Sequence, residues 1–364
     1  MADKNNKKNG FLAYEIVIGG IDASQKAVVA KQLAVTIEAG LPILEALAIS
    51  RDSSQGRMKR ILTEVMESVS TGHTLADSFA RQPKYFSKLF VNSIYAGEES
   101  GTLSEAFRGL AVQMTKEKEL IGKIRGALVY PLFVLLTAII LGMSISLFVL
   151  PKITPLFEGL NVKLPFTTII IIEFSKLVQL YGYYLFPAII GLIFLTFWAW
   201  RQKWAKPVTD ILVLNMPVIK HISKGSNIVQ FCRALATLLK SGLNVTQALE
   251  VAHDSVTNFY YRKALKSVAD RVAKGTSINE NLEQHQWIFP LIVTRMIKVG
   301  EESGRLEETL FYLADYFDNE VDASTKNLST SIEPILLLSI GGIVAFLALS
   351  IITPIYEITG KIGR

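Results

Sequence analysis

The feature that most constrains the fold of this chain is a five-residue stretch that occurs twice. Gly97-Glu98-Glu99-Ser100-Gly101 returns unchanged, at an offset of 203 residues, as Gly300-Glu301-Glu302-Ser303-Gly304. The same offset relates five further positions on either side of the stretch, Phe86, Leu103, Leu110, Pro131 and Pro151, to Phe289, Leu306, Leu313, Pro334 and Pro354. Solenoid repeats have periods of roughly 20–50 residues. A match over so long a span therefore indicates a duplicated domain.

Each copy contains residues that are typical of the beginnings and ends of short helices. A glycine follows each of several amphipathic runs, as a residue with positive φ does at a helix C-terminus; these are Gly40, Gly72, Gly101, Gly242, Gly275 and Gly304. Thr74 and Ser277 are placed as N-caps, each with a carboxylate three residues later, Asp77 and Glu280. Pro42 suits the first position of a helix and Asn244 an N-cap. No long stretch alternates apolar and polar residues, so we predict an all-α chain.

The helices on either side of the repeated stretch each show one apolar face. Their apolar residues recur at the i, i+3/i+4, i+7 spacing of a buried helix face: Phe86, Leu89, Phe90 and Ile94 before the first turn, Phe289, Ile292, Val293 and Ile297 before the second, and Leu103, Phe107, Leu110, Met114, Leu306, Leu310, Leu313 and Phe317 after them. Each copy is therefore predicted to be an antiparallel bundle of about six helices.

Both copies run into a stretch long enough to cross a membrane. Residues 129–150 and 335–354 carry no charged side chain, and about 20 apolar residues span a hydrocarbon core. A third apolar stretch, 177–200, has no partner in the repeat. With three spans both bundles lie on the same side, and Lys and Arg are enriched beside them, which marks the cytoplasmic side.

The predicted architecture is thus an integral membrane protein with two homologous cytoplasmic bundles and three transmembrane helices. Its segments are a tail, 1–21; the first bundle, 22–128; a first span, 129–150; an external connection, 151–176; a second span, 177–200; the second bundle, 201–334; a third span, 335–354; and an external tail, 355–364.

The spans carry small residues at helical spacing. Ala138, Gly142 and Ser146 share one side of the first span, and Gly341 and Ala345 share one side of the third. Small residues let helix backbones approach closely in lipid, although Gly and Ala are also common in membrane helices generally. Because Ala138 and Gly142 fall on Gly341 and Ala345 at the repeat offset, we predict that these positions pack against other helices.

Several classes of function find no support in the sequence. The net charge of +6 without a clustered basic region argues against nucleic-acid binding. One cysteine, Cys232, excludes an intramolecular disulfide. Common nucleotide-binding, metalloprotease and CxxC motifs are absent, and the spans lack the ionisable residues that proton and ion pathways need. We therefore predict no catalytic residue, no metal and no cofactor.

The acidic turns themselves allow three interpretations. Glu98 and Glu301 stand four residues after Ile94 and Ile297, at the edge of the buried face. They could accept N–H bonds at the start of the next helix, ligate a metal, or help to dock a partner. We favour the first, because carboxylates at helix N-termini are common and a hard cation takes about six oxygens or more. Glu99 and Glu302 point further from the buried face and are better placed for docking.

Taken together, the duplicated bundle, the repeated turn, the Tyr130-Pro131 and Glu333-Pro334 pairs and the prolines at 151 and 354 resemble one family. This is the inner-membrane platform protein of type IV pilus and type II secretion machines, the PilC/GspF family. The resemblance covers about residues 22–357.

The resemblance implies a protein without catalysis of its own in a bacterial inner membrane. Its partners would be a cytoplasmic hexameric assembly ATPase, pilin or pseudopilin subunits, other inner-membrane assembly proteins, and further copies of itself. Whether the machine builds a pilus or secretes proteins stays open. An alternative is a small membrane receptor or transporter subunit, which is disfavoured because the external connection is too short for a ligand-binding domain.

Overall fold

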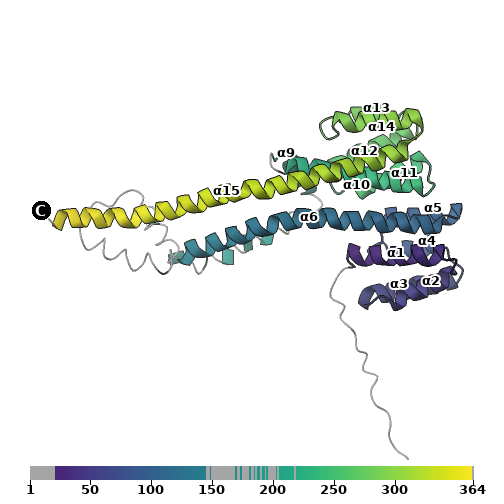
Figure 1. The fold of residues 1–364 in the computed structure, drawn as a ribbon, viewed down its shortest axis with the longest axis horizontal. Coiled ribbons are helices and arrows are strands. Elements are labelled where there is room, and N and C mark those ends of the chain that lie inside the picture. Colours follow the sequence, from purple (N-terminus) through teal and green to yellow (C-terminus); the bar gives the residue numbers. More distant parts are fainter. Residues whose placement is uncertain are drawn as a thin grey trace, which may run out of the picture. The chain divides into compact units, whose positions relative to one another are not determined.

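The structure is a computed structural model that describes residues 21–144, 205–216 and 219–362, together with isolated positions between 148 and 202. Every regular element in this described part is a helix (Figure 1). The first copy contributes α1 Ala23–Glu38, α2 Ile43–Asp52, α3 Gly56–Ser70, α4 Leu75–Ala80, α5 Lys88–Ser100 and α6 Leu103–Ser144. The second contributes α9 Lys206–Asn215, α10 Lys220–Lys240, α11 Val245–Ala252, the 3-10 turn η2 His253–Ser255, α12 Phe259–Val272, α13 Ile278–Glu283, α14 Leu291–Ser303 and α15 Leu306–Ile362. The prediction of an all-helical chain is confirmed for these residues.

The helices repeat as the sequence does. At the offset of 203 residues, α13 and α14 begin and end on the counterparts of the ends of α4 and α5. In this way α1 to α6 correspond in order to α10 to α15. All six predicted helix-ending glycines have positive φ, between 71° at Gly304 and 96° at Gly242. A glycine adopts this left-handed conformation without the steric penalty of a Cβ atom.

The predicted N-terminal caps have mixed outcomes. Thr74 accepts the N–H of Asp77 at 3.0 Å, and Asn244 accepts the N–H of Gln247 at 2.9 Å, as predicted. Ser277 is the N-cap residue of α13, as predicted, but its side chain accepts no backbone N–H. Pro42 is itself the N-cap of α2 rather than its first residue.

Packing divides the chain into two compact units along different lines from the repeat. One unit holds the described residues up to Lys118 together with Ala234–Ser255; the other holds Glu119–Arg233 and Val256 onward. The end of α10 and all of α11 therefore belong to the second copy by sequence and to the first unit by packing. The predicted segment boundaries stay predictions.

Aromatic residues fill the centre of each unit. In the first, the ring of Phe90 lies 5.2 Å from that of Phe79 and 4.7 Å from that of Phe86, centroid to centroid. In the second, the Tyr261 and Phe289 rings lie 5.1 Å apart, and the buried Tyr261 hydroxyl donates to the carbonyl of Ile288 at 2.5 Å. The predicted buried faces beside the two turns are correct except at Ile292, which is exposed.

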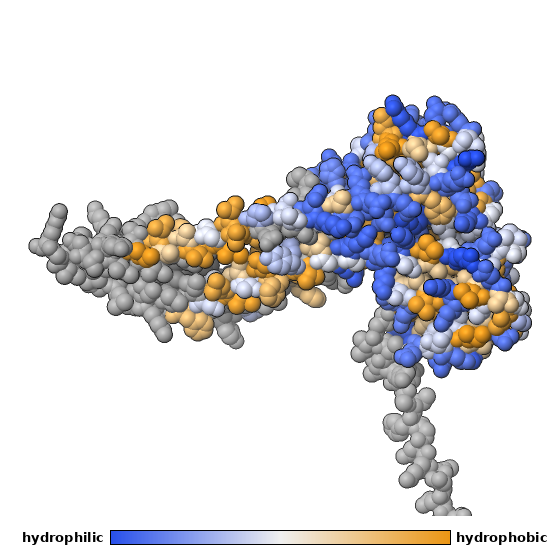
Figure 2. Space-filling model, in the orientation of Figure 1, coloured by the Kyte–Doolittle hydropathy of each residue, from blue (hydrophilic) through white to orange (hydrophobic). Residues whose placement is uncertain are grey.

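Two helices extend far beyond their bundle positions. At about 1.5 Å per residue, the 42 residues of α6 and the 57 residues of α15 span roughly 63 and 86 Å. Figure 2 shows that apolar residues gather along the C-terminal parts of both helices, where the large side chains around Leu132 and Leu337 are exposed.

One helix among the described residues, Leu103–Ser144, is long and apolar enough to cross a membrane, and a shorter apolar stretch covers Pro334–Phe346. Most of the predicted span at 177–200 lies outside the described residues.

Candidate functional site

Each acidic turn joins two helices that approach closely. A Cβ atom placed on Gly97 would lie 2.7 Å from the Cβ of Ala106 and 3.1 Å from the Cα of Leu103. On Gly300 it would lie 2.9 Å from Oγ1 of Thr309 and 3.1 Å from the Cα of Leu306. Real Cβ contacts are longer than this, so the first glycine of the motif is required by the contact between the helix that ends at the turn and the helix that begins there.

The first glutamate of each turn holds the start of a short helix. The carboxylate of Glu98 accepts the N–H groups of Leu75 and Ala76 at 2.7 and 2.8 Å. Glu301 does the same for Ile278 and Asn279 at 2.7 and 3.0 Å. Our expectation that these glutamates accept N–H bonds at a helix start agrees with this geometry. The helix is α4 or α13, however, whose first amides precede the glutamate by 22 and 23 residues, and not the helix that follows the turn.

These bonds satisfy donors that the helix itself leaves unpaired. The first N–H groups of any helix have no intrahelical acceptor, and a carboxylate at this end also interacts favourably with the helix dipole. Leu75 and Ala76 are buried, so water is a poor substitute. The glutamate therefore joins α5 to α4, and α14 to α13, by a pair of charge-assisted hydrogen bonds.

The last residues of the motif close the helix. Gly101 and Gly304 have φ of 72° and 71°, and nothing crowds a Cβ placed on either. Ser100 donates from Oγ to the carbonyl of Ala96 at 2.7 Å, whereas Ser303 makes only a long bond, 3.5 Å, to the carbonyl of Gly300.

The second glutamate of each turn is exposed. Glu302 lies 3.8 Å from Nζ of Lys298 on the same helix. Across the described residues, no group of three or more His, Cys, Asp or Glu side chains could hold a metal ion. Because both oxygens of Glu98 and Glu301 already accept N–H groups, these turns offer a cation few ligands.

A network of charges around the buried Arg233 and Asp318, which the sequence did not lead us to predict, lies in the second unit. The buried guanidinium of Arg233 on α10 lies 3.1 Å from Asp315 and 3.5 Å from the buried carboxylate of Asp318, both on α15. Lys123 of α6 lies 3.9 Å from Asp318 and 3.8 Å from Asp322. The ion pair of Asp322 with Lys326, at 3.0 Å, lowers the pKa of the Asp322 carboxyl. The sequence feature that could have indicated this network is three aspartates at positions i, i+3 and i+7 of one helix.

The corresponding place in the first unit is an open groove between α1 and α6. Its volume is about 460 Å³, and alanines and valines line it beside three cations: Ala27, Lys31, Ala34, Val35, Arg108, Ala111, Val112, Thr115 and Lys116. Arg108 is also paired with Glu38. Upstream of the turn the repeat slips by one residue, to an offset of 202, which pairs Gly40 with Gly242 and Lys31 with Arg233. At the offset of 203, Val112 and Thr115 correspond to Asp315 and Asp318.

Comparisons with known proteins identify the family of this chain. The sequence profile of a family described as "Type II secretion system (T2SS), protein F" matches residues 29–151 and again residues 231–354. The two matches cover most of the chain and fall on the two copies of the repeat. The chain belongs to this family.

Relatives in the protein F family carry two kinds of name. A "Type IV pilus assembly protein PilC" from Myxococcus xanthus is 31% identical over 98% of this chain and 86% of its own length. One of the same name from Thermus thermophilus is 31% identical over 93% and 83%. A "Type II secretion system protein F" from Aeromonas hydrophila is 31% identical over 94% and 89%. The resemblance stated from the repeated turn is thereby confirmed at the level of the family.

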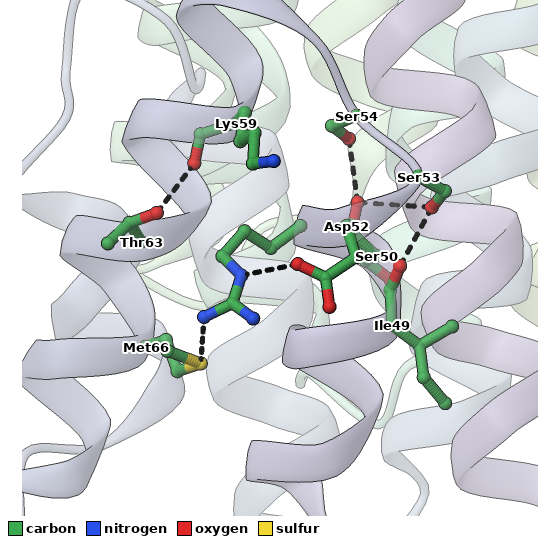
Figure 3. A network of polar contacts seen from close by, with 9 residues as sticks. Ile49, Ser50, Asp52, Ser53, Ser54, Lys59, Thr63 and Met66 are labelled. Carbon is green, nitrogen blue, oxygen red and sulfur yellow. Dashed lines mark hydrogen bonds and ion pairs between the residues drawn. The ribbon is translucent and has the colours of Figure 1, made fainter.

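The end of α2 carries a polar network that the sequence did not single out (Figure 3). Arg51 donates from Nε to Asp52 at 2.9 Å and approaches the sulfur of Met66 on α3 at 3.6 Å. The hydrogen bond from Arg51 lowers the pKa of the Asp52 carboxyl. Ser54 donates to the carbonyl of Ser50 at 2.7 Å. These bonds satisfy groups at the helix C-terminus and hold α2 against α3.

Cys232 is fully buried in α10. Burial raises the pKa of its thiol to about 12. Since the thiolate is the nucleophile, the side chain is inert packing in the folded protein.

The predicted membrane-packing positions stay predictions. Ala138 and Gly142 are half-buried on α6, while Gly341 and Ala345 on α15 are exposed; Ser146 lies outside the described residues.

Proposed function

We propose that this protein is the inner-membrane platform of a type IV pilus or type II secretion machine. In this role it couples a cytoplasmic assembly ATPase to pilin or pseudopilin subunits in the membrane. Two helical bundles would face the cytoplasm and three transmembrane helices would cross the bilayer. The protein contributes no catalysis; it holds partners and passes movement between them.

The observation that carries this proposal is the continuity of α6 and α15. Each helix begins at an acidic turn, is buried among other helices over its first turns, and continues as one helix, past Pro131 in α6 and Pro334 in α15, into exposed apolar residues. An unbroken helix transmits rotation and displacement along its axis, whereas a flexible linker would absorb them. A movement imposed on the turn is thus delivered to the apolar segment.

The first experiment interrupts this connection in α6. Gly-Gly-Ser inserted after Gly122, an exposed position between the packed and the apolar parts of the helix, should abolish pilus assembly or secretion in cells lacking the native copy. The protein should still enter the membrane and co-purify with its ATPase. The matched control is the same insertion after Ser54, in the loop between α2 and α3, which should leave assembly intact. Normal assembly with the α6 insertion would contradict a mechanical role for the helix.

A second experiment asks whether the turns dock the ATPase. Glu99 and Glu302 are exposed at equivalent places in the two copies, so Glu99→Lys with Glu302→Lys reverses two charges without touching the caps at Glu98 and Glu301. We expect the double variant to lose ATPase in a pull-down while keeping its helical circular dichroism. Binding at the strength of the unaltered protein would place the ATPase elsewhere.

A further inference from the structure

The first copy of the repeat is covered by a piece of the second. The end of α10 and all of α11 pack within the first unit, with α11 against α5. The Nζ of Lys88 lies 2.8 Å from a carboxylate oxygen of Asp254. A Cβ placed on Gly109 of α6 would lie 3.3 Å from Thr237, and one on Gly242 would lie 3.8 Å from Ser100. The α5–α6 pair therefore has a helical hairpin seated across it.

Among the residues that the structure describes, nothing covers the homologous surface of the second copy in this way. On α5, Leu89 and Ala96 are each 7% exposed; their counterparts on α14, Ile292 and Val299, are 40% and 55% exposed. On α15, Tyr312 stands where Gly109 stands on α6, and it is 57% exposed. Single exposed apolar side chains are ordinary on a protein surface, but these three stand at the counterparts of positions that are buried, or in close contact with α10, in the first copy.

No other described element covers the homologous hairpin of the first copy either. On α10 and α11, Thr237 and Val251 are 3% and 9% exposed. Their counterparts are Val35 on α1, 57% exposed, and Ile49 on α2, 42% exposed. The chain thus makes one of two related contacts internally, and both halves of the other contact are left apolar and open.

The charges on the two open halves are complementary. The α14 surface presents Arg295 and Lys298 beside Ile292 and Val299. The α2 surface presents Glu45 and Asp52 on either side of Ile49, and Asp52 is also paired with Arg51 at 2.9 Å. In the contact made internally, the corresponding residues on α5 are the uncharged Asn92 and Tyr95, and the ion pair there joins Lys88 to Asp254, the counterpart of Asp52. Complementary charges favour one partner and one register.

We propose that the α1–α2 hairpin of one chain binds the α14–α15 surface of a second copy of the same chain. The internal contact supplies the register. Asp52 would lie beside Leu291, as Asp254 lies beside Lys88. Gly40 would lie beside Ser303, as Gly242 lies beside Ser100. Val35 would pack on Tyr312, as Thr237 packs on Gly109. Every chain offers both halves, so reciprocal exchange between two chains, or head-to-tail closure of a ring, leaves neither surface exposed.

Cysteine cross-linking of the full-length chain in native membranes tests this register. Two differently tagged chains are co-expressed, one with Val35→Cys and the other with Tyr312→Cys, and treated with a short bismaleimide. Cys232 is retained because it is buried and unreactive. We expect a cross-linked species carrying both tags, and the same for Asp52→Cys with Leu291→Cys. The matched control is Lys59→Cys, an exposed position on α3, with Tyr312→Cys, which should not cross-link.

Charge reversal gives the second arm. Arg295→Glu with Lys298→Glu on the Tyr312→Cys chain should weaken the affinity between the two chains about tenfold. The two-tag product of the Val35/Tyr312 pair should fall by the same factor. Glu45→Lys with Asp52→Lys on the other chain should restore it. Absence of two-tag product from both matched pairs would overturn the proposal. So would cross-linking only within a single chain that carries both cysteines, because the occupant would then be the same molecule.

Discussion

The two copies differ at the place where their first and last helices meet. In the first unit, α1 and α6 leave a groove lined by Lys31, Val112 and Thr115. In the second unit, the counterparts Arg233, Asp315 and Asp318 close the α10–α15 junction with ion pairs. One ancestral position has thus become an open apolar surface in one copy and a buried polar contact in the other. The two copies therefore keep the same order of helices but have different side chains where those helices meet.

The acidic turn shows the opposite behaviour. In both copies the first glycine sits at a close helix contact, the first glutamate holds two amides of a distant helix, and the last glycine has positive φ. These are constraints on backbone atoms, which any sequence with this fold must satisfy. Side-chain contacts such as the Arg233 network can be made in many ways. The two copies therefore share the backbone constraints of the turn and differ in their side-chain contacts.

The largest expected effect lies in the Arg233 network. Arg233→Met leaves Asp318 as a buried carboxylate with one fewer partner, and breaking a buried pair costs about 3–5 kcal/mol. Lys31→Met, at the homologous exposed position, should change stability by no more than about 0.5 kcal/mol. Thermal unfolding of the two variants in detergent compares them. Equal shifts in Tm would mean that the two junctions do not differ as described. Asp318→Asn added to Arg233→Met should recover part of the loss.

The next effect concerns the close approach at Gly97. Gly97→Ala places a Cβ against Ala106 and Leu103, and overpacking of this kind costs about 1–3 kcal/mol. We expect faster hydrogen exchange in α5 and the first turns of α6, measured by mass spectrometry. Ala106→Gly in the same chain removes the nearest atom, so the double variant should be less destabilised than the two single changes predict by addition. Strict additivity would show that the contact is not tight.

Much of this arrangement could be predicted from the sequence because it depends on local backbone chemistry. The glycine-terminated helices, the Asn244 cap and the buried faces beside each turn follow from residue type and spacing alone. The partner of Glu98 could not be predicted, because the Leu75 amide is 23 residues away and is brought near only by packing. Arg233 and Asp315 are separated by 82 residues for the same reason. Ile292 was expected to be buried like Leu89; packing covers Leu89 and leaves Ile292 exposed.

An effect of similar size is expected at the glutamates that join the helices. Glu98→Gln keeps one acceptor oxygen and turns an NH₂ group toward the second amide, so one buried N–H loses its partner, at a cost of about 1–3 kcal/mol. Glu301→Gln should behave in the same way because its contacts are the same. Hydrogen exchange at the start of α4 and of α13 reports each change separately. A variant with wild-type protection at both helices would exclude the capping role. Glu99→Gln, on the exposed face, is the matched control.

The smallest expected effect on stability concerns one hydroxyl group, which forms a hydrogen bond in the first copy and none in the second. In the first, the amides of Leu75 and Ala76 are held by Glu98, and Thr74 accepts the next one, that of Asp77. In the second, Glu301 holds the amides of Ile278 and Asn279, but Ser277 accepts nothing, and its buried hydroxyl has no partner among the described residues.

Thr74→Ala removes a working N-cap, which costs about 1 kcal/mol. Ser277→Ala removes a buried polar atom that makes no bond, so it should be neutral or slightly stabilising. We therefore expect protection from exchange to fall in α4 for Thr74→Ala and to stay unchanged or rise in α13 for Ser277→Ala. Equal losses in the two helices would mean that Ser277 caps α13 after all, and that the copies are more alike at this position than the hydrogen bonds indicate.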